Sequence, residues 1–153
     1  MIAGLGGAMI DTEGLDHVHL RVADREAVAA WLGRVLGLRV AERFRDWAED
    51  PRGPLFLETH DGRSALALFQ GPTGRDGDST IAFRVKAAAF SKFVAALPEL
   101  GLRDRDGRSV TADAVVDHGK AWSVYFCDPY GNRFELSTYD YAEVLASRDG
   151  AAT

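Results

Sequence analysis

The chain has 153 residues, a formal net charge of −5 and 46% hydrophobic residues. This length and composition are typical of one globular domain, or of two half-size units that share a core. The acidic balance and the lack of any run of five basic residues argue against nucleic-acid binding. No window of eighteen residues is wholly apolar, so no membrane span is expected.

The N-terminal segment and the cysteine content together predict a cytoplasmic protein. The first ten residues are small and apolar, but the first cationic side chain is Arg21, whereas a secretory signal places positive charge ahead of its apolar core. Cys127 is the only cysteine, so it cannot form an internal disulfide, which fits a reducing compartment. Because Cys127 ends an apolar run, we expect inert packing rather than nucleophilic chemistry.

The first predicted element is a strand over residues 16–22, where apolar and polar side chains alternate. A helical pattern follows over residues 24–36, with Asp24 suited to the N-cap and Gly37 to the C-terminal stop. Three extended runs come next, and Asp61-Gly62 predicts a hairpin turn between the last two. These runs span residues 39–47, 55–59 and 64–70.

The same order of elements then begins again at residues 79–85. A helix is predicted over residues 87–100, and Gly101 ends it. Extended runs follow at residues 102–106, 110–116, 121–127 and 133–139. The turn-rich segment 71–78 links the two copies, and a short terminal helix is expected over residues 141–147. The chain therefore divides into modules at residues 14–70 and 78–139, with a helix or tail at 140–153, all in one structural unit.

This duplication predicts an α+β fold in which two βαβββ repeats pair their sheets around a cleft, with the helices on the outer faces. The reason is that one copy alone cannot bury both faces of its sheet. The apolar side chains of each opening strand pack on the helices, and the alternate side chains face the cleft. The expected cleft residues are His17, His19, Arg21, Thr80, Ala82, Arg84, Glu135 and Ser137.

Glu135 lies between Phe134 and Leu136 on a predicted strand that directly follows a Pro-Tyr-Gly-Asn turn. Strands disfavour glutamate, so this carboxylate needs an explanation. An inward-facing carboxylate is a candidate metal ligand or acid/base group. The alternative is a solvent-facing side chain on an amphipathic strand.

Three motifs together resemble the vicinal oxygen chelate superfamily, which includes glyoxalase I, extradiol dioxygenases, fosfomycin-resistance enzymes and bleomycin-binding proteins. The motifs are residues 15–18 (LDHV), residues 35–38 (VLGL) and residues 124–135 (VYFCDPYGNRFE). The resemblance covers residues 14–139. It implies the paired fold but leaves the reaction open, because this fold hosts several chemistries and also binding proteins.

The resemblance also implies a metal site. In the enzymes, a divalent cation in the cleft chelates two neighbouring substrate oxygens and acts as a Lewis acid. His17 matches the first-strand histidine of the family and Glu135 its last-strand glutamate, and these ligands suit Fe, Mn, Ni, Zn or Co. The chain departs from the pattern at Thr80, which replaces the second histidine, and at residues 66–68 (LAL), where glyoxalase I has an acid.

His19 is the candidate for a third ligand. It lies two residues after His17 on one strand, so both imidazoles point the same way. With Glu135 they would form a three-ligand set with open positions, as catalytic metals require. The alternative is that His19 is a polar cleft residue that binds ligand or water.

The resemblance to extradiol dioxygenases implies catalytic roles for Tyr125 and His118. Tyr125 precedes Glu135 by the spacing seen in those enzymes and would hydrogen-bond a substrate oxygen. His118 lies two residues from the position of their loop histidine and would serve as acid/base, since imidazole titrates near neutral pH. Alternatively, His118 holds a turn, and Tyr125 is a buried phenol bonded to a neighbour.

We therefore predict a metal-dependent enzyme with dioxygenase-like or glyoxalase-like chemistry on a small molecule with adjacent oxygens. Arg21 and Arg84 would attract an anionic substrate. The further predicted substrate contacts are Thr80, Trp122 and Ser137. The protein is expected to be a homodimer, as family members often are, and the sequence leaves open whether the modules pair within a chain or across the dimer.

The alternative function is a metal-free protein of the bleomycin-resistance type, which sequesters a drug or other ligand. Thr80 and the apolar residues 66–68 favour it. Aromatic side chains near the cleft would then stack on a planar ligand. They are Phe69, Trp122, Tyr125 and Tyr139.

Overall fold

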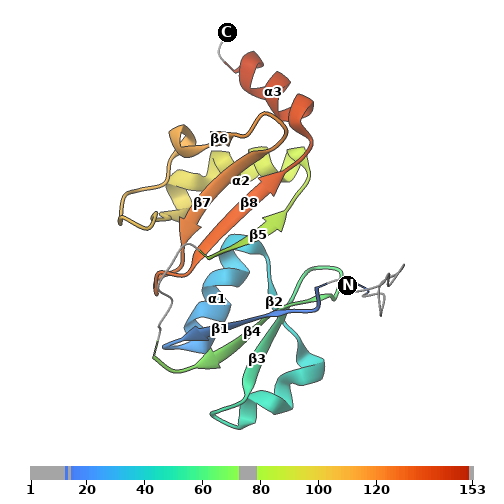
Figure 1. Ribbon diagram of the computed structural model, residues 1–153, viewed down its shortest axis with the longest axis vertical. Coiled ribbons are helices and arrows are strands. Elements are labelled where there is room, and N and C mark those ends of the chain that lie inside the picture. The colour runs from blue at the N-terminus through green and yellow to red at the C-terminus, as the bar shows by residue number, and fades with distance from the viewer. Residues whose placement is uncertain (1–12, 14, 73–78, 152–153) are drawn as a thin grey trace, which may run out of the picture.

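A computed structural model describes residue 13, residues 15–72 and residues 79–151. Within these residues the chain forms two four-stranded mixed sheets with helices, and each half follows the predicted βαβββ order (Figure 1). The predicted α+β class and its two βαβββ repeats are therefore confirmed. The expectations for the N-terminal ten residues and for most of the linker 71–78 concern residues outside the described part of the chain.

The N-terminal half forms a sheet with the strand order β1-β4-β3-β2. The opening strand β1 runs parallel to β4, and the other neighbours are antiparallel. Its elements are β1 (Val18–Val22), α1 (Arg25–Leu36), β2 (Arg39–Val40), the 3₁₀ helix η1 (Glu42–Glu49), β3 (Pro54–Glu58) and β4 (Ser64–Gln70).

The C-terminal half repeats this topology with the strand order β5-β8-β7-β6, and β5 runs parallel to β8. Its elements are β5 (Thr80–Arg84), α2 (Ala87–Leu100), the 3₁₀ helix η2 (Ala112–Ala114), β6 (Val116–Asp117), β7 (Trp122–Cys127), β8 (Arg133–Thr138) and α3 (Tyr141–Gly150). The described residues include no helix with the length and hydropathy that a membrane crossing requires.

The two long helices begin and end near the predicted residues because their caps are local. The Asp24 side chain accepts a hydrogen bond from the backbone N–H of Ala27, and Gly37 closes α1 with a φ of 68°. Gly101 closes α2 in the same way, with a φ of 61°. At the start of α2 the carboxylate of Asp140 accepts from the N–H of Ala87, so a residue distant in sequence supplies this cap.

One hydrophobic core joins the two halves. The apolar face of the first sheet, which includes Leu20 and Val22, packs on α1, as predicted. Trp31, on α1, reaches the other half, where its ring lies 6.1 Å from that of Phe126 and 6.3 Å from that of Phe134, between centroids. Helix α1 therefore lies between the halves (Figure 1) and leaves the opposite face of each sheet free for polar residues.

The extended run predicted over residues 39–47 is wrong after Val40, because residues 42–49 form η1. Long-range polar contacts hold η1 in place. The buried guanidinium of Arg25 donates to the backbone carbonyls of Ala48 and Gly53. A local strand pattern cannot anticipate these contacts, which come from residues twenty or more positions away.

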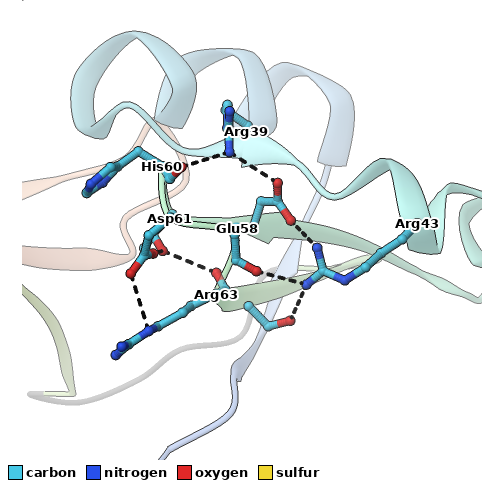
Figure 2. A network of polar contacts seen from close by, with 9 residues as sticks. Arg39, Arg43, Glu58, His60, Asp61 and Arg63 are labelled. Atoms are coloured by element: carbon cyan, nitrogen blue, oxygen red, sulfur yellow. Dashed lines mark hydrogen bonds and ion pairs between the residues drawn. The ribbon is translucent and has the colours of Figure 1, made fainter.

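A second anchor of η1 is the carboxylate of Glu58 on β3, which pairs with Arg43 and Arg39 (Figure 2). Arg43 also donates to the carbonyl of Gly62 at 3.2 Å and to the hydroxyl of Ser64 at 3.3 Å. This network ties η1 to the hairpin between β3 and β4. It thereby fixes the aromatic side chains of η1 against the sheet.

The extended runs predicted at residues 102–106 and 110–116 are also largely wrong. The carboxylate of Asp104 accepts hydrogen bonds from the N–H groups of Asp106 and Arg108, both at 2.9 Å, which curls the chain into a turn. Gly107 completes this turn with a φ of 77°. Of the second run only Val116 joins the sheet, as the first residue of β6 (Val116–Asp117).

The turn before β8 is built around the buried carboxylate of Asp128. One oxygen accepts from the backbone N–H groups of Tyr130 and Asn132, and the other accepts from the Asn132 side chain. Gly131 has a φ of 84°, which favours glycine at this position. The Asp-Pro-Tyr-Gly-Asn motif is therefore a structural turn that sets the start of β8, and with it the position of Glu135.

Replacing Asp128 with alanine is expected to lower the free energy of unfolding by about 2–4 kcal/mol, because buried N–H donors lose their acceptor. Urea denaturation measures this loss. The exposed Asp113 provides the control, and its alanine variant should stay within about 0.5 kcal/mol of the parent. Equal stability of the two variants would contradict this role for Asp128.

Candidate functional site

One polar face of the N-terminal sheet carries both predicted histidine ligands. On β1 the side chains of Leu20 and Val22 point to the core, so His17, His19 and Arg21 lie on the opposite face. His19 is in register with Ala67 of β4, and Arg21 with Phe69. The strand period of two thus places both imidazoles on one face, as the sequence predicted.

The two imidazoles are in direct contact. Their Nε2 atoms are 3.0 Å apart, and the rings are stacked with centroids 5.0 Å apart. On its other side, His17 uses Nδ1 to contact Oδ2 of Asp16 at 2.5 Å. Because a carboxylate only accepts, Nδ1 of His17 carries a proton, and in the neutral imidazole Nε2 then holds the lone pair.

This arrangement fits a pair of metal ligands. The 3.0 Å between the two Nε2 atoms is the length of an ordinary hydrogen bond, and it also equals the spacing of two nitrogen ligands at about 2.1 Å from one metal and at right angles to each other. A carboxylate on the far nitrogen of a ligating histidine is the usual way to fix its tautomer and ring orientation. Asp16 supplies that carboxylate for His17.

Aromatic rings surround the two histidines. His17 packs against Phe56, with centroids 4.8 Å apart, and His19 packs against Phe69 at the same separation. Phe56 in turn contacts Phe44 and Trp47 of η1. We call this continuous set the aromatic array. Its members are Trp47, Phe44, Phe56, His17, His19 and Phe69.

The polar face of the C-terminal sheet carries Glu135. Its neighbours in register are Ala82 on β5 and Tyr125 on β7, so these positions share a face as predicted. The hydroxyl of Ser123 donates to Oε1 of Glu135 at 2.6 Å and lies 3.2 Å from the hydroxyl of Ser137. Ser123 is fully buried, so this contact holds the Glu135 carboxylate in one orientation.

Tyr125 and His118 lie beside Glu135. The Nε2 atom of His118 is 3.2 Å from the phenol oxygen of Tyr125, and the rings are nearly perpendicular. The pKa of the Tyr125 phenol is raised above its ordinary value. Burial is the larger cause, and the nearby Glu135 carboxylate is the second. Like any tyrosine, Tyr125 is protonated near neutral pH and presents a hydrogen-bond donor, and its raised pKa makes loss of that proton harder. Arg133 stacks over its ring at 4.6 Å.

Of the other predicted substrate contacts, Thr80 and Arg84 lie on the polar face of the C-terminal sheet, whereas Trp122 does not. Thr80 and Arg84 share the face of Glu135, since they pair with Arg133 and Ser137 of β8. Thr80 also accepts a hydrogen bond from Arg133 at 3.5 Å. Arg84 is exposed and lies over the ring of Tyr139.

Trp122 does not lie on this face, so its expected role as a substrate contact does not fit the structure. It alternates with Ser123, is buried, and stacks on Tyr141 of α3 with centroids 5.3 Å apart. Its indole N–H donates to the backbone carbonyl of Tyr141. The strand is apolar on one face and mixed on the other, and Trp122 belongs to the apolar face.

Cys127 fits the expectation of an inert thiol. It is buried, and burial, with a smaller contribution from the adjacent Asp128, raises its pKa. A thiol with a raised pKa holds little thiolate, so it is a poor nucleophile.

Within one chain the two polar faces remain separate. His17 and His19 contact Asp16 and the aromatic array, whereas Glu135 contacts Ser123, and no hydrogen bond or ion pair between described residues links the two sets. Among residues 13, 15–72 and 79–151, no group of three or more His, Cys, Asp or Glu side chains is placed to hold a metal. A three-ligand site therefore needs side chains from both faces to meet.

The sequence analysis missed the residues that support the ligands. Asp16 was quoted only as part of a motif, although its position just before His17 is a signal for a supporting carboxylate. Ser123 had no such signal, because its contact with Glu135 follows from the pairing of β7 with β8. Phe44 and Trp47 were missed because residues 39–47 were predicted to be extended.

The family follows from a comparison with known sequences. The model of the Glyoxalase/Bleomycin resistance protein/Dioxygenase superfamily matches residues 14–136. The chain therefore belongs to that superfamily, which confirms the resemblance found in the sequence. No curated protein shows significant similarity to the chain.

Solved structures with the same fold include both resistance proteins and an oxidase. The oxidase ChaP-H2 is 25% identical, with a TM-score of 0.63, and the match covers 88% of this chain and 99% of the other. The fosfomycin resistance protein FosX from Mesorhizobium loti is also 25% identical, with a TM-score of 0.58 and the same coverage. FosX from Listeria monocytogenes, in complex with Mn(II) and sulfate, is 19% identical, with a TM-score of 0.62 over 90% of this chain and 99% of the other.

Replacing Glu135 with glutamine should lower the pKa of Tyr125, because the neighbouring negative charge is removed, but not fully to its ordinary value, because the ring stays buried. A pH titration of ring-labelled tyrosine by NMR measures the shift. The exposed Glu99 provides the control, and its glutamine variant should leave the Tyr125 resonance unchanged. An unchanged or higher Tyr125 pKa in the Glu135 variant would contradict this electrostatic coupling.

Proposed function

We propose that the protein is a metal-dependent enzyme acting on a small molecule with adjacent oxygens, with His17, His19 and Glu135 as ligands. The observation that carries the proposal is the His17–His19 pair, whose Nε2 atoms are 3.0 Å apart and in which Asp16 holds Nδ1 of His17. Glu135, held by Ser123, supplies the carboxylate. Imidazole and carboxylate ligands together suit Mn, Fe, Ni, Zn or Co.

The ligands would meet between two copies of the chain. The His17 face and the Glu135 face belong to different sheets, and no described contact joins them within one chain. In a homodimer, the first sheet of one copy can cover the last sheet of the other, and each of two equivalent sites then takes histidines from one chain and Glu135 from its partner. Members of the superfamily that build sites from two chains support this arrangement.

A bound metal would supply Lewis acidity to neighbouring oxygens of the substrate. Manganese is the first metal to test, because the similar FosX from Listeria monocytogenes was solved with Mn(II). The substitution of Thr80 for the second histidine leaves a neutral hydroxyl at that position. His19 replaces the missing imidazole in this proposal.

The remaining residues of the Glu135 face would handle the substrate and its proton. Tyr125, which is protonated near neutral pH, donates a hydrogen bond to a substrate oxygen. His118, 3.2 Å from the Tyr125 oxygen, accepts or returns the proton as acid/base. The exposed Arg84 attracts an anionic substrate, and Ser137 supports Ser123 beside Glu135. The reaction class proposed is dioxygenase-like or glyoxalase-like.

A second candidate function is metal-free sequestration of a planar ligand, as in bleomycin-resistance proteins. The aromatic array favours it, because three phenylalanines and a tryptophan line a single face of the first sheet. The replacement of a ligand histidine by Thr80 also favours it. Whether the protein binds a metal therefore distinguishes the metal-dependent enzyme from the metal-free binding protein.

Titration of the chelator-treated protein with Mn(II), followed by calorimetry, tests the metal site. The variants His17→Ala and Glu135→Gln should each bind Mn(II) roughly a hundredfold more weakly, and Asp16→Asn roughly tenfold more weakly, since it only orients His17. His60→Ala is the control, because His60 is exposed in the turn between β3 and β4 and should leave affinity unchanged.

Two results would contradict the proposed metal site. The first is a parent protein that binds none of Mn, Fe, Ni, Zn or Co, which would favour the sequestration function. The second is equal loss of affinity in the His60 and His17 variants, which would show that His17 has no special role.

A further inference from the structure

We propose that the substrate is a planar aromatic carboxylate, whose ring packs on Phe69 and whose carboxylate binds Arg21. This inference deepens the proposed function by naming the substrate class. It rests on that function in one respect only, which is that the reacting end of the substrate lies beside His17 and His19. The binding site itself consists of residues of the first sheet and does not require the metal.

A cavity is present at the required place. It has a volume of about 300 Å³ and is lined by His19, Leu20, Arg21 and Phe69. This volume lies at the small end of the range of about 300–1,000 Å³ that small-molecule sites occupy. The cavity therefore suits one or two fused rings.

The walls of the cavity favour a flat ring. Phe69 is half-buried and lies 4.8 Å from the ring of His19, at an interplanar angle of 44°. From there the aromatic array continues through His17 to Phe56. Aromatic rings attract one another through offset and edge-on contacts, which an aliphatic ring cannot reproduce.

The charge in the cavity favours an anion. Among the described residues, Arg21 makes no ion pair, whereas five ion pairs engage other arginines with acids: Arg39–Glu58, Arg43–Glu58, Arg52–Asp50, Arg63–Asp61 and Arg108–Asp106. A guanidinium matches a carboxylate with two parallel hydrogen bonds. Arg21 is thus a cation available for a ligand in a protein of net negative charge.

Gly71 leaves the space that the Arg21 side chain occupies. A Cβ at Gly71 would lie 2.8 Å from Nη1 of Arg21 and 3.4 Å from its Cδ, so the arginine lies directly over the glycine. The N–H of Gly71 donates to the carbonyl of Val22, which fixes the glycine beside β1. Any side chain at position 71 must move the guanidinium away.

The spacing along β1 orients the ligand. Arg21 and His19 are alternate residues of one strand, so their Cα atoms are roughly 7 Å apart, about the length of a benzoate. A carboxylate at Arg21 therefore directs the far edge of the ring toward His19 and His17. Oxygen substituents on that edge would reach the metal ligands, which joins this site to the proposed chemistry.

Calorimetric titration with 2-naphthoate tests the inference, using chelator-treated protein. The parent should bind 2-naphthoate at least roughly tenfold more tightly than 2-naphthol, which lacks the carboxylate, and than cyclohexanecarboxylate, which lacks the aromatic ring. Arg21→Ala should weaken 2-naphthoate binding by roughly tenfold or more without affecting 2-naphthol. Phe69→Leu should weaken binding of both aromatic probes.

Arg34→Ala is the matched control. Arg34 is exposed on α1, so this substitution removes the same charge at a position away from the cavity. It should bind 2-naphthoate like the parent. Gly71→Ala is a second, milder test, since it displaces Arg21 without changing any charge, and it should weaken 2-naphthoate but not 2-naphthol. Circular dichroism checks that every variant is folded.

The inference is overturned if the parent binds 2-naphthol as well as 2-naphthoate, or if Arg21→Ala and Arg34→Ala behave alike. Titrating the same samples with Mn(II) separates this failure from that of the proposed function. Metal binding without 2-naphthoate binding overturns the substrate class alone. Binding of 2-naphthoate to a protein that takes up no metal supports the aromatic site and contradicts the metal-dependent enzyme.

Discussion

The two-residue period of β1 and β8 is the constraint on which the candidate site depends. Burying Leu20 and Val22 against α1 obliges His17, His19 and Arg21 to share the opposite face. Burying Phe134 and Leu136 does the same for Glu135 and Ser137. A slip of one residue in either strand would place ionisable side chains in the core at a cost of several kcal/mol. The hydrophobic core thus selects which side chains are available for chemistry.

Two of the three candidate ligands, His17 and Glu135, are held by neighbouring side chains. Asp16 fixes the tautomer of His17, and the buried Ser123 orients Glu135. The same principle applies to the aromatic array, since Arg25 and Glu58 anchor η1 so that its rings pack on Phe56. Such preorganisation reduces the conformational entropy lost when a ligand binds.

The sequence predicted those parts of the fold that local signals determine. Both long helices ended near the predicted glycines, because an αL glycine is a local stop, and the alternation of β1 and β8 identified the faces of His17 and Glu135. It did not predict η1, since that segment depends on Arg25 and Glu58, which are distant in the chain. Trp122 was expected to contact the substrate but faces the core, because an aromatic residue suits either face of a strand and only the contact with α3 settles its direction. No local pattern encodes whether the two faces meet, because the proposed meeting lies between two copies of the chain.

The most direct test of a site shared between two chains is to mix the His17→Ala and Glu135→Gln proteins. In a mixed dimer, one site loses both ligands while the other keeps both, so exchange of subunits at random should restore about one quarter of the parent's Mn(II) sites. Native mass spectrometry establishes that mixed dimers have formed. Recovery of metal binding on mixing is the result expected here. Mixed dimers that bind no more Mn(II) than the separate variants would show that His17 and Glu135 do not meet across the subunit interface.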